Sequence, residues 1–475
     1  MSPPLLFEIN TRCWLRALAN RLGKPATLAS VPEEEIAGWK ENGFTHIWLM
    51  GVWTTGPKTL AIARAQADLR AQSVEAFGVG GEEKLVSSPY AIADYTVAES
   101  LGEPAALRQF RSRLHQHDLR LVLDFIPNHV GLDHRWLIEK NSLFVRSSSP
   151  KPETFRVEHA GGASWVAHGK DPYFAAWADT AQLDYRLPGT RTAMTEALQS
   201  VAAECDGARC DMAMLVLNEI FEKTWAQFPI SQPAPPAEFW NEAISAVKKE
   251  HPQFLFMAEA YWDLEPRLQE LGFDCVYDKR FYDYLTHRDF PALQRQVRAV
   301  AGKFNPVRFL ENHDEPRIAS LMTLPEQKAA AVLLLSQPGA RLLHDGQLTG
   351  ARQRTPVQFA EYWPESPNEE VTAFYDHLLS LLPQTVIGRG EMEFCDTGLP
   401  QCFAVKWKDT SRISLVLVNL ASESASFQLR GFGSEYGVAK SYSDPISTSN
   451  LVGGFLDIRL AANGFQLLEL CPTAK

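Results

Sequence analysis

Residues 207–215 read GARCDMAML, a run of small and apolar residues that carries Arg209 and Asp211 two positions apart. Side chains alternate between the two sides of a strand, so Arg209 and Asp211 point one way while Cys210 and Met212 point the other. Two opposite charges on one side of a buried strand are typical of a barrel interior, near the end where active sites are assembled. The run therefore predicts a barrel strand.

Further apolar runs of strand length recur through the first three quarters of the chain, and amphipathic stretches of helical period lie between most of them. EPAALRQFRSRLHQHD precedes the third run, and AEFWNEAISAVKKEHP precedes the fifth. Eight strands that alternate with helices form the pattern of a (β/α)8 TIM barrel, an α/β fold. In chain order the runs are LLFEIN near residue 5, HIWLMGV at 46, RLVLDFI at 120, GARCDMA at 207, FLFMAEA at 254, FDCVYD at 273, VRFLENHD at 307 and ARLLHDG at 340.

Two segments depart from this alternation. Residues 131–186 are rich in Ser, Gly, Pro and aromatic residues and have little helical period, which predicts a small subdomain inserted after strand 3. From residue 386 onward, runs such as CFAVKW and ISLVLVNL alternate and are separated by turn residues, which predicts a C-terminal antiparallel β-sandwich. We therefore expect a barrel over 1–130 and 187–385, an insert over 131–186 and a sandwich over 386–475.

Composition restricts the class of partner and the compartment. The formal net charge is -11 and no segment concentrates lysine and arginine, so we expect no nucleic-acid partner. The 7 cysteines are scattered without a C-x-x-C spacing, which favours reduced thiols in a cytosol. We find neither a basic and apolar leader at the N-terminus nor a run of about 18 apolar residues. The sequence predicts a soluble cytoplasmic protein without a membrane partner and leaves its oligomeric state open.

Polar and acidic residues follow the apolar runs at several predicted strand ends. A charge placed there costs free energy unless it has a partner, so the repetition around one rim of the barrel indicates a site rather than chance. Any one of these groups alone would fit a structural ion pair or a solvated carboxylate. The residues are Asp124, Asn128 and His129 after strand 3, Arg209 and Asp211 on strand 4, Glu259 after strand 5, and Asn312, His313 and Asp314 after strand 7.

In their order these segments resemble the motifs of glycoside hydrolase family 13, the α-amylase family. DFIPNHVG resembles the first motif, GARCDMAM the second, FMAEAYW the third and FLENHDEPR the fourth. GFTHIWLMGVW, SPYAIADY, AQLDY and GQLTGARQR are similar to supporting segments of the same family. The resemblance covers nearly the whole chain and implies a TIM barrel with an inserted subdomain and a C-terminal sandwich.

The resemblance implies a role for each of three carboxyl groups. Asp211 corresponds to the nucleophile, Glu259 to the general acid/base, and Asp314 to the carboxylate that steadies the distorted sugar. The acid must keep its proton until it is needed and the nucleophile must be ionised, and Arg209 stands where it favours the charged form of Asp211. Carboxyl groups about 5–5.5 Å apart would give a retaining double displacement through a covalent glycosyl-enzyme.

The resemblance also implies substrate-binding residues. His129 and His313 match positions that hydrogen-bond sugar hydroxyls, and Tyr90 matches an aromatic residue that stacks on the sugar; without the motifs, each would fit an ordinary core residue. Together with Arg209 they complete the predicted site. Arg317 fits the cleft and a surface or interdomain position equally well.

No cofactor is required by this chemistry, and calcium stays open. Asn128 and Asp184 match places where many relatives bind a structural calcium ion between barrel and insert. Calcium takes six or more oxygen ligands, and these two residues are fewer than it needs. Asn128 fits equally well a role in which its amide pins the loop.

Two departures from the family pattern bear on the substrate. Met214-Leu215 stands where many starch-degrading relatives carry Lys-His, and Ser87 stands where exo-acting relatives often carry an acidic residue. The insert offers aromatic residues that fit either sugar stacking or packing onto the barrel. They are Trp165, Tyr173, Phe174 and Trp177.

The main expectation is a retaining glycosidase that acts on α-glucosidic bonds of α-glucans or maltooligosaccharides. An intracellular transglycosylase or disaccharide isomerase would share its first half-reaction, and the sequence leaves this alternative open. A non-catalytic relative that only binds sugar would be expected to have lost carboxylates that this chain keeps. A metal-dependent barrel hydrolase that uses His129 and His313 is weaker still, because a third nitrogen ligand is not evident.

Overall fold

The computed structural model describes residues 3–230, 235–300, 304–433 and 435–472. The remaining positions of the predicted barrel and sandwich, 1–2, 231–234, 301–303, 434 and 473–475, lie outside the described residues. Within the described ranges, eight parallel strands close into a barrel in the order β1-β15-β14-β13-β12-β11-β5-β2. These are the eight predicted runs: β1 (Leu5–Asn10), β2 (His46–Met50), β5 (Arg120–Phe125), β11 (Gly207–Cys210), β12 (Leu255–Ala258), β13 (Cys275–Tyr277), β14 (Pro306–Arg308) and β15 (Ala340–His344).

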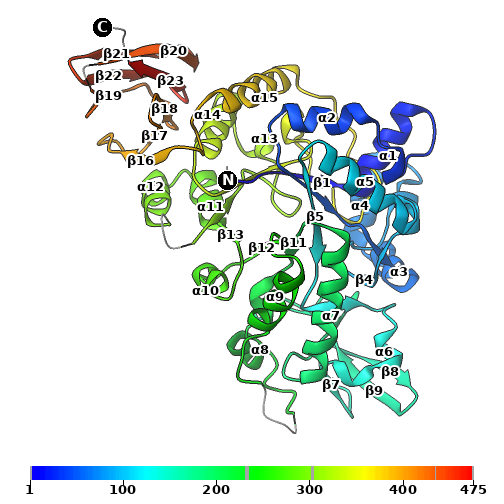
Figure 1. The fold of residues 1–475 in the computed structure, drawn as a ribbon. Coiled ribbons are helices and arrows are strands. Elements are labelled where there is room, and N and C mark those ends of the chain that lie inside the picture. The colour runs from blue at the N-terminus through cyan, green and yellow to red at the C-terminus, as the bar shows by residue number, and fades with distance from the viewer. Residues whose placement is uncertain (1–2, 231–234, 301–303, 434, 473–475) are drawn as a thin grey trace.

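Helices surround this barrel, and both stretches predicted from helical period form helices, α5 and α9 (Figure 1). Local sequence fixes several helix ends. The Asn10 side chain accepts from the Cys13 N–H at the start of α1, and Gly23 ends that helix with φ 67°. The barrel helices are α1 (Thr11–Leu22), α2 (Glu33–Glu41), α3 (Pro57–Ala65), α4 (Ala67–Phe77), α5 (Pro104–Gln116), α7 (Pro188–Glu204), α8 (Asn218–Thr224), α9 (Phe239–Glu250), α10 (Glu265–Glu270), α11 (Lys279–Thr286), α12 (Phe290–Ala299), α13 (Ile318–Leu321), α14 (Leu324–Leu335) and α15 (Glu369–Leu381).

The barrel interior is a layer of alternating side chains. Leu6, Trp48, Val122, Met257 and Leu342, each on a different strand, belong to one buried apolar cluster inside the barrel. Two positions further along the same strands, towards their carboxyl ends, the inward side chains include acids and a histidine. Because side chains alternate along each strand, the inward positions are apolar in the middle of the barrel and polar at its carboxyl end.

The insert after β5 contains short antiparallel strands, which confirms the predicted subdomain. It lies at the lower right of Figure 1, away from the C-terminal strands. One sheet pairs β10 with β6, and another has the order β7-β9-β8. The elements are β6 (His129–Gly131), α6 (Trp136–Glu139), β7 (Arg146–Ser147), β8 (Thr154–His159), β9 (Gly162–Ala167) and β10 (Thr180–Gln182).

The chain between β2 and β5 also carries more than a single barrel helix, which the sequence did not predict. Besides α3, α4 and α5, it contains an antiparallel pair, β3 (Trp53–Thr55) with β4 (Ile92–Val97). Residues 84–90 run between α4 and β4 and carry Tyr90 to the rim of the barrel.

The C-terminal strands form two facing antiparallel sheets, as expected for a β-sandwich. Leu415 and Leu468 of the first sheet and Leu456 and Leu460 of the second belong to one buried cluster between them. Among the described residues the first sheet has the order β16-β17-β18-β23-β20 and the second β19-β22-β21. The strands are β16 (Glu391–Cys395), β17 (Cys402–Lys408), β18 (Ile413–Asn419), β19 (Ala425–Arg430), β20 (Tyr436–Asp444), β21 (Thr448–Val452), β22 (Phe455–Leu460) and β23 (Phe465–Pro472).

Candidate active site

The predicted nucleophile and acid lie side by side at the carboxyl ends of β11 and β12. The parallel pairing of these strands continues past their ends, because the Glu259 N–H donates to the Cys210 carbonyl at 3.0 Å and the Ala213 N–H donates to the Glu259 carbonyl at 3.0 Å. Asp211 is anchored on its other side, where its N–H donates to the Phe125 carbonyl at 2.9 Å. Both side chains therefore project into the cleft at the rim of the barrel.

Arg209 contacts both carboxyl groups. Its Nη1 lies 2.6 Å from Asp211 Oδ1, and its Nη2 lies 2.8 Å from Glu259 Oε2. The guanidinium is fully buried, and its carbon lies 5.3 Å from the ring centre of Trp48 and 5.4 Å from that of Tyr90. This aromatic enclosure fixes the cation between the two acids, whereas the sequence predicted its contact with Asp211 alone.

Glu259 is buried and held by two further donors. The Met212 N–H donates to Glu259 Oε2 at 2.7 Å, and the Tyr261 hydroxyl donates to Oε1 at 2.8 Å. Met212 reaches this position in the left-handed region, with φ 43°, which is uncommon for a side chain of its size. Burial raises the pKa of Glu259 to about 7; Arg209 opposes the rise, and Asp211 and Asp314 add to it.

Burial also raises the pKa of Asp211, while the charge and hydrogen bond of Arg209 oppose that rise. Glu259 and Asp211 are thus two acids around one cation, in an environment that disfavours full ionisation of both. A cluster of this kind can hold one proton near neutral pH. That is the protonation state that acid-assisted attack by a carboxylate needs.

Asp314, on the loop after β14, lines the same cleft from a strand two places away from β12 in the barrel order. Its side chain is 48% exposed, and its Oδ2 lies 3.0 Å from His313 Nε2. Desolvation in the cleft raises the pKa of Asp314, but the charge and hydrogen bond of His313 outweigh it and hold the pKa well below its usual range. Asp314 is therefore ionised at neutral pH.

Tyr90 and His313 form a stacked pair beside these acids. Their ring centres lie 5.4 Å apart with an angle of 22°, and the Tyr90 hydroxyl lies 2.7 Å from His313 Nε2. His129 is also near, with its ring centre 5.1 Å from that of Trp177. Burial lowers the pKa of His129 to about 4, so this ring is neutral and can both donate and accept a hydrogen bond.

A cleft of about 710 Å³ joins these residues, a volume that suits a small-molecule substrate. Asp211, Glu259, Asp314, Tyr90 and His129 line it directly, while Arg209 and His313 lie behind them. The remaining lining comes from the insert and from the segments that follow β2, β11, β12 and β15: Asp171, Phe174, Ala176, Trp177, Ala178, Asp179, Thr180, Gln66, Ser88, Met212, Tyr261 and Gln358.

The aromatic residues of the insert divide between cleft and packing. Phe174 and Trp177 line the cleft, and Phe174 is 76% exposed. Tyr173 packs edge-on against Trp262 from the loop after Glu259, with ring centres 5.0 Å apart. Trp165 lies within β9. Met214 and Leu215 are buried, so they present no polar group to a substrate.

The two residues predicted to bind calcium are each bonded to protein donors. Arg186 Nε lies 2.8 Å from Asp184 Oδ1 and Arg186 Nη2 lies 2.7 Å from Oδ2, so both carboxylate oxygens face one guanidinium. Asn128 Oδ1 accepts from Gln182 Nε2 at 2.9 Å. In the part of the chain that the structure describes, no three His, Cys, Asp or Glu side chains gather as metal ligands. These residues do not fit calcium.

Arg317 lies away from the cleft. Its Nη1 is 2.7 Å from Glu311 Oε1 and 2.7 Å from His344 Nδ1, and the side chain is buried. It ties the loop after β14 to the end of β15. The structure therefore gives Arg317 a place in the barrel wall rather than a contact with substrate.

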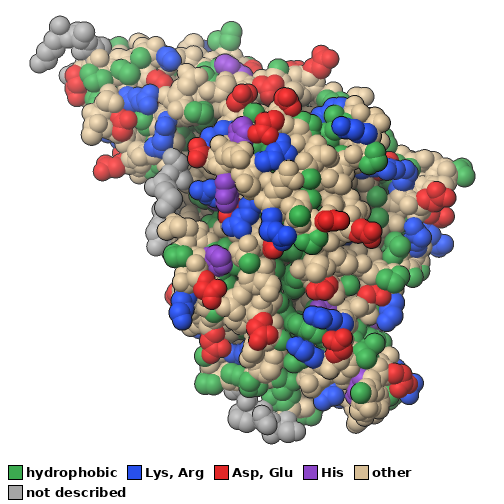
Figure 2. Space-filling model, turned by 45° about the vertical axis from the view of Figure 1, so that its right-hand side comes forward, with side chains coloured by type: hydrophobic (Ala, Val, Ile, Leu, Met, Phe, Trp, Pro, Cys, Tyr) green, Lys and Arg blue, Asp and Glu red, His purple; other side chains and the backbone are tan. Residues whose placement is uncertain are grey.

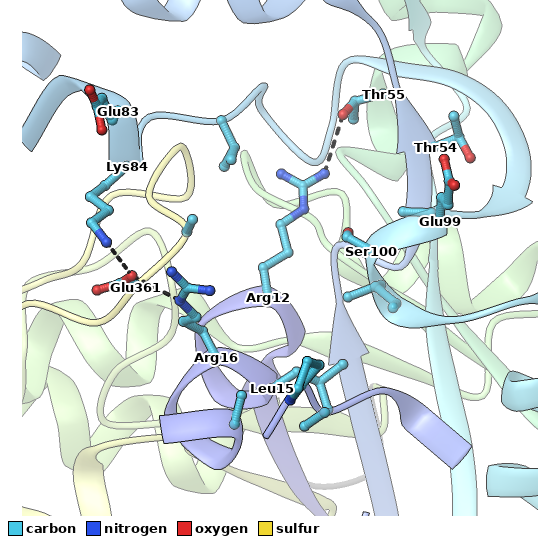
Figure 3. Close-up of a pocket in the computed structure, with 17 residues that line it drawn as sticks. Arg12, Leu15, Arg16, Thr54, Thr55, Glu83, Lys84, Glu99, Ser100 and Glu361 are labelled. Atoms are coloured by element: carbon cyan, nitrogen blue, oxygen red, sulfur yellow. Dashed lines mark hydrogen bonds and ion pairs between the residues drawn. The ribbon is translucent and has the colours of Figure 1, made fainter. Parts of the chain in front are cut away.

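A second cavity, of about 750 Å³, is lined by residues of α1 and by the segments that contain Thr55 and Lys84 (Figure 3). Arg12 extends into it, donates to the Ser87 carbonyl at 2.6 Å and reaches Thr55 Oγ1 at 3.5 Å. Arg16 and Lys84 both meet Glu361 at its edge. Arg12 thus holds the segment of residues 84–90 through the Ser87 carbonyl, three positions before Tyr90.

The outer surface carries charges of both signs. Figure 2 shows lysine and arginine side chains interspersed with aspartate and glutamate over the face in view. Across the described ranges, none of the helices has the length and apolar character needed to cross a bilayer.

Sequence reasoning missed three contributors to the site. Tyr261 stands two positions beyond the acid in the motif FMAEAYW, and the motif alone predicts no role for it. The Met212 N–H acts through the backbone, which no side-chain pattern reveals. Glu8, whose Oε1 lies 2.5 Å from His313 Nδ1, belongs to the run LLFEIN, and its inward position on β1 was the available signal.

A model of the alpha amylase catalytic domain matches residues 39–378. Curated relatives include the alpha-amylase MalA of Haloarcula japonica, 26% identical over 275 residues, which covers 56% of this chain and 37% of the relative. The intracellular maltogenic amylase of Bacillus subtilis is 24% identical over 329 residues, or 64% of this chain and 51% of the relative. The chain thus spans about half the length of these relatives or less.

Among solved structures, the fold is similar to a noncanonic maltogenic alpha-amylase, AmyB, from Thermotoga neapolitana. The TM-score is 0.69 at 18% identity, and the match covers 99% of each chain. At this identity the likeness concerns the arrangement of the barrel, the insert and the C-terminal sheets.

Proposed function

This chain belongs to the alpha-amylase catalytic-domain family, and from that premise we propose that it is a retaining glycosidase acting on α-glucosidic bonds of α-glucans or maltooligosaccharides. One observation carries the proposal: Asp211, Glu259 and Asp314 line a single cleft, where burial raises the pKa values of Asp211 and Glu259 and His313 lowers that of Asp314. A buried pair of acids that shares one proton near neutral pH supplies the acid and the nucleophile that a double displacement requires.

In the proposed first half-reaction, Glu259 donates its proton to the glycosidic oxygen as Asp211 attacks the anomeric carbon. The bond from that carbon to the leaving sugar breaks, and an ester to Asp211 forms. Asp314 is ionised opposite them, where its charge stabilises the positive character that the sugar ring develops. Arg209 remains bonded to Asp211 and orients its attacking oxygen.

In the second half-reaction, Glu259 is a carboxylate and takes a proton from water. The water oxygen attacks the anomeric carbon, the ester to Asp211 breaks, and the sugar leaves with its original configuration. The Met212 N–H and the Tyr261 hydroxyl support this step, because each donates to Glu259 and favours its charged form.

The sugar in the cleaved position would lie against Tyr90 and near His129, both of which line the cleft. An aromatic face suits the apolar face of a pyranose, and a neutral imidazole suits its hydroxyl groups. Phe174 and Trp177 extend this surface along the insert. We propose a cytoplasmic place for the chain, in keeping with a relative named as an intracellular maltogenic amylase.

The test is to incubate the purified protein with maltooligosaccharides, isomaltose, sucrose and trehalose and to identify the products. We expect shorter α-glucans, with the α-anomer as the first product seen by proton NMR. Glu259→Gln is the matched control and should lower kcat/KM on natural substrates by about 10²–10⁴-fold without a change in fold. A β-anomer as first product, or no reaction on any α-glucoside, would contradict the proposal; longer or rearranged sugars would assign a transferase.

A further inference from the structure

Glu8 is a buried carboxylate that the mechanism above does not use. It lies on β1 with its side chain inside the barrel, two residues after Leu6 of the interior cluster, and it is 0% exposed. Its Oε1 lies 2.5 Å from His313 Nδ1. Within the described residues its Oε2 has no hydrogen-bond partner, so the contact with His313 is its main polar attachment.

His313 therefore lies between two carboxylates. Nδ1 faces Glu8 at 2.5 Å, and Nε2 faces Asp314 at 3.0 Å and the Tyr90 hydroxyl at 2.7 Å. A neutral imidazole carries one N–H and can donate to only one of them. Both contacts are hydrogen bonds to ionised acceptors only if both ring nitrogens carry a proton, which makes the ring an imidazolium.

The charged groups around this pair agree with that state. Burial raises the pKa of Glu8, but the charges of His344, His313 and Arg209 outweigh burial and bring the pKa below its usual value, so the carboxylate is ionised. Burial lowers the pKa of His313, but Asp314 and Glu8 outweigh it and raise the value to about 10. The charge of His313 also lowers the pKa values of Asp124 and Asp211, although burial raises both.

We propose that Glu8 is a positioning residue that keeps His313 doubly protonated, so that His313 holds Asp314 ionised and aligned in the cleft. The role of Asp314 in the reaction rests on the proposed function, whereas the state of His313 does not. The hydrogen bond between Glu8 and His313 also sets the plane of the His313 ring, on which Tyr90 stacks. Glu8 acts through His313, since it does not line the cleft.

The direct test follows the ring nitrogens of His313 by long-range ¹H–¹⁵N NMR between pH 6 and 9, with the signal assigned from a His313→Gln sample. We expect the wild-type ring to stay doubly protonated throughout. In Glu8→Gln, which keeps the size and the acceptor oxygen but removes the charge, the ring should titrate at least about one pH unit lower than in the wild type. A neutral wild-type ring at pH 7.5 would overturn the proposal without any variant.

Asp278→Asn is the matched control, because it also neutralises a buried carboxylate at a barrel strand end, where Asp278 pairs with Arg308. It should leave the His313 titration unchanged. An equal shift in both variants would mean that any lost barrel charge loosens the ring, and would count against Glu8.

Kinetics give the second arm. The ratio of kcat/KM in Glu8→Gln to that in the wild type should fall as pH rises through the His313 pKa that NMR measures in the variant, by about twofold at that pH, and should recover at low pH as His313 regains its proton. A ratio that is constant with pH would show a merely structural role. If no α-glucoside is cleaved at all, the proposed function fails, and the NMR titration still tests the state of His313.

Discussion

At the scale of single residues, three carboxyl groups in the site are paired with two cations, Arg209 and His313. Arg209 contacts both Asp211 and Glu259, so this arginine alone does not decide which acid keeps a proton. Asp314 has a separate cation in His313, which leaves the other two acids to compete for Arg209. Two carboxylates that share one guanidinium repel each other, so a proton remains on the pair of Asp211 and Glu259 near neutral pH. Glu259 is the more deeply buried of the two and therefore carries that proton.

This arrangement predicts the pH dependence of activity. Glu259 must be protonated to act as the acid, and its pKa is raised to about 7, so kcat/KM should fall as pH rises through about 7. Tyr261→Phe removes a donor that favours the charged form of Glu259. The pKa should then rise further, and the alkaline limb should move up by about one pH unit.

The check is a pH–rate profile of both proteins on one maltooligosaccharide. Tyr173→Phe serves as the control, since that side chain is 66% exposed and packs on Trp262 rather than on an acid. Its profile should overlie that of the wild type. An alkaline limb that moves down in Tyr261→Phe would show that the hydroxyl does not stabilise the carboxylate.

How far the sequence predicts the site depends on the kind of signal each residue leaves. Arg209 and Asp211 were found together because the period of two places both on one side of a strand. Glu8 follows the same rule on β1, but a single acid in an apolar run is also compatible with an exposed strand edge. Its partner, His313, lies 305 residues away in the chain, and only the closed barrel brings the two together.

At the scale of elements, an arginine joins the insert to the barrel. Arg186 stands between β10 and α7, bonds both oxygens of Asp184, and donates to the carbonyls of Trp225 at 3.3 Å and Phe228 at 2.7 Å. One guanidinium thus connects the end of the insert to the chain after α8. Its planar set of donors fits a carboxylate and two carbonyls at once, which an ammonium could not match.

We expect Arg186→Met to lower the free energy of unfolding by about 3–5 kcal/mol, because Asp184 would be left as a buried charge without its cation. Arg156→Met, which breaks an exposed pair with Glu158 in the same insert, should change it by less than about 1 kcal/mol. Urea denaturation at neutral pH measures both. Equal effects in the two variants would contradict a special role for Arg186.

The same junction predicts how the protein responds to metal removal. Asn128 and Asp184 already have protein donors on their oxygens, so a chelator has no ligand set to disrupt there. Addition of EDTA should leave the Tm unchanged, and calcium should not raise it. A fall in Tm with EDTA, reversed by calcium, would show that a cation stabilises the fold through other oxygen ligands.

At the scale of the whole molecule, the sequence predicts the large units better than the segments between them. All eight barrel strands were predicted, and so was a C-terminal sandwich of alternating strands, because buried apolar runs and a period of two are visible in the sequence itself. The chain between β2 and β5 was not, although α3, α4 and the β3–β4 pair lie there. Those elements are short and half-buried, so their pattern is weak, yet they deliver Tyr90 to the cleft.

The C-terminal sandwich is joined to the barrel through its five-stranded sheet. Alternate residues of β18 face two different cores: Leu415 and Leu417 face the second sheet, while Val416 and Val418 belong to the core that contains α14 and α15. This explains why every residue of β18 is buried. Polar contacts reinforce the joint, since Lys328 on α14 lies 2.8 Å from Asp444 on β20.

Trp407 on β17 is the single side chain best placed to test this joint. It is buried, and its indole N–H donates at 2.9 Å to the Ser336 carbonyl at the end of α14. Trp407→Ala should cost about 3–5 kcal/mol through lost apolar contact and an unfilled cavity. Because that loss falls on the boundary, the single calorimetric transition expected of the wild type should separate into two, with the sandwich unfolding first.

Val452→Ala supplies the comparison, since Val452 lies on the outer sheet of the same sandwich and is 62% exposed. It should keep one transition and change stability by no more than about 0.5 kcal/mol. If Trp407→Ala unfolds in two transitions and Val452→Ala in one, the sandwich owes part of its stability to contact with the barrel helices. If Trp407→Ala also unfolded in one transition at an unchanged Tm, the Trp407 contact would not stabilise the joint between barrel and sandwich, and the prediction would be wrong.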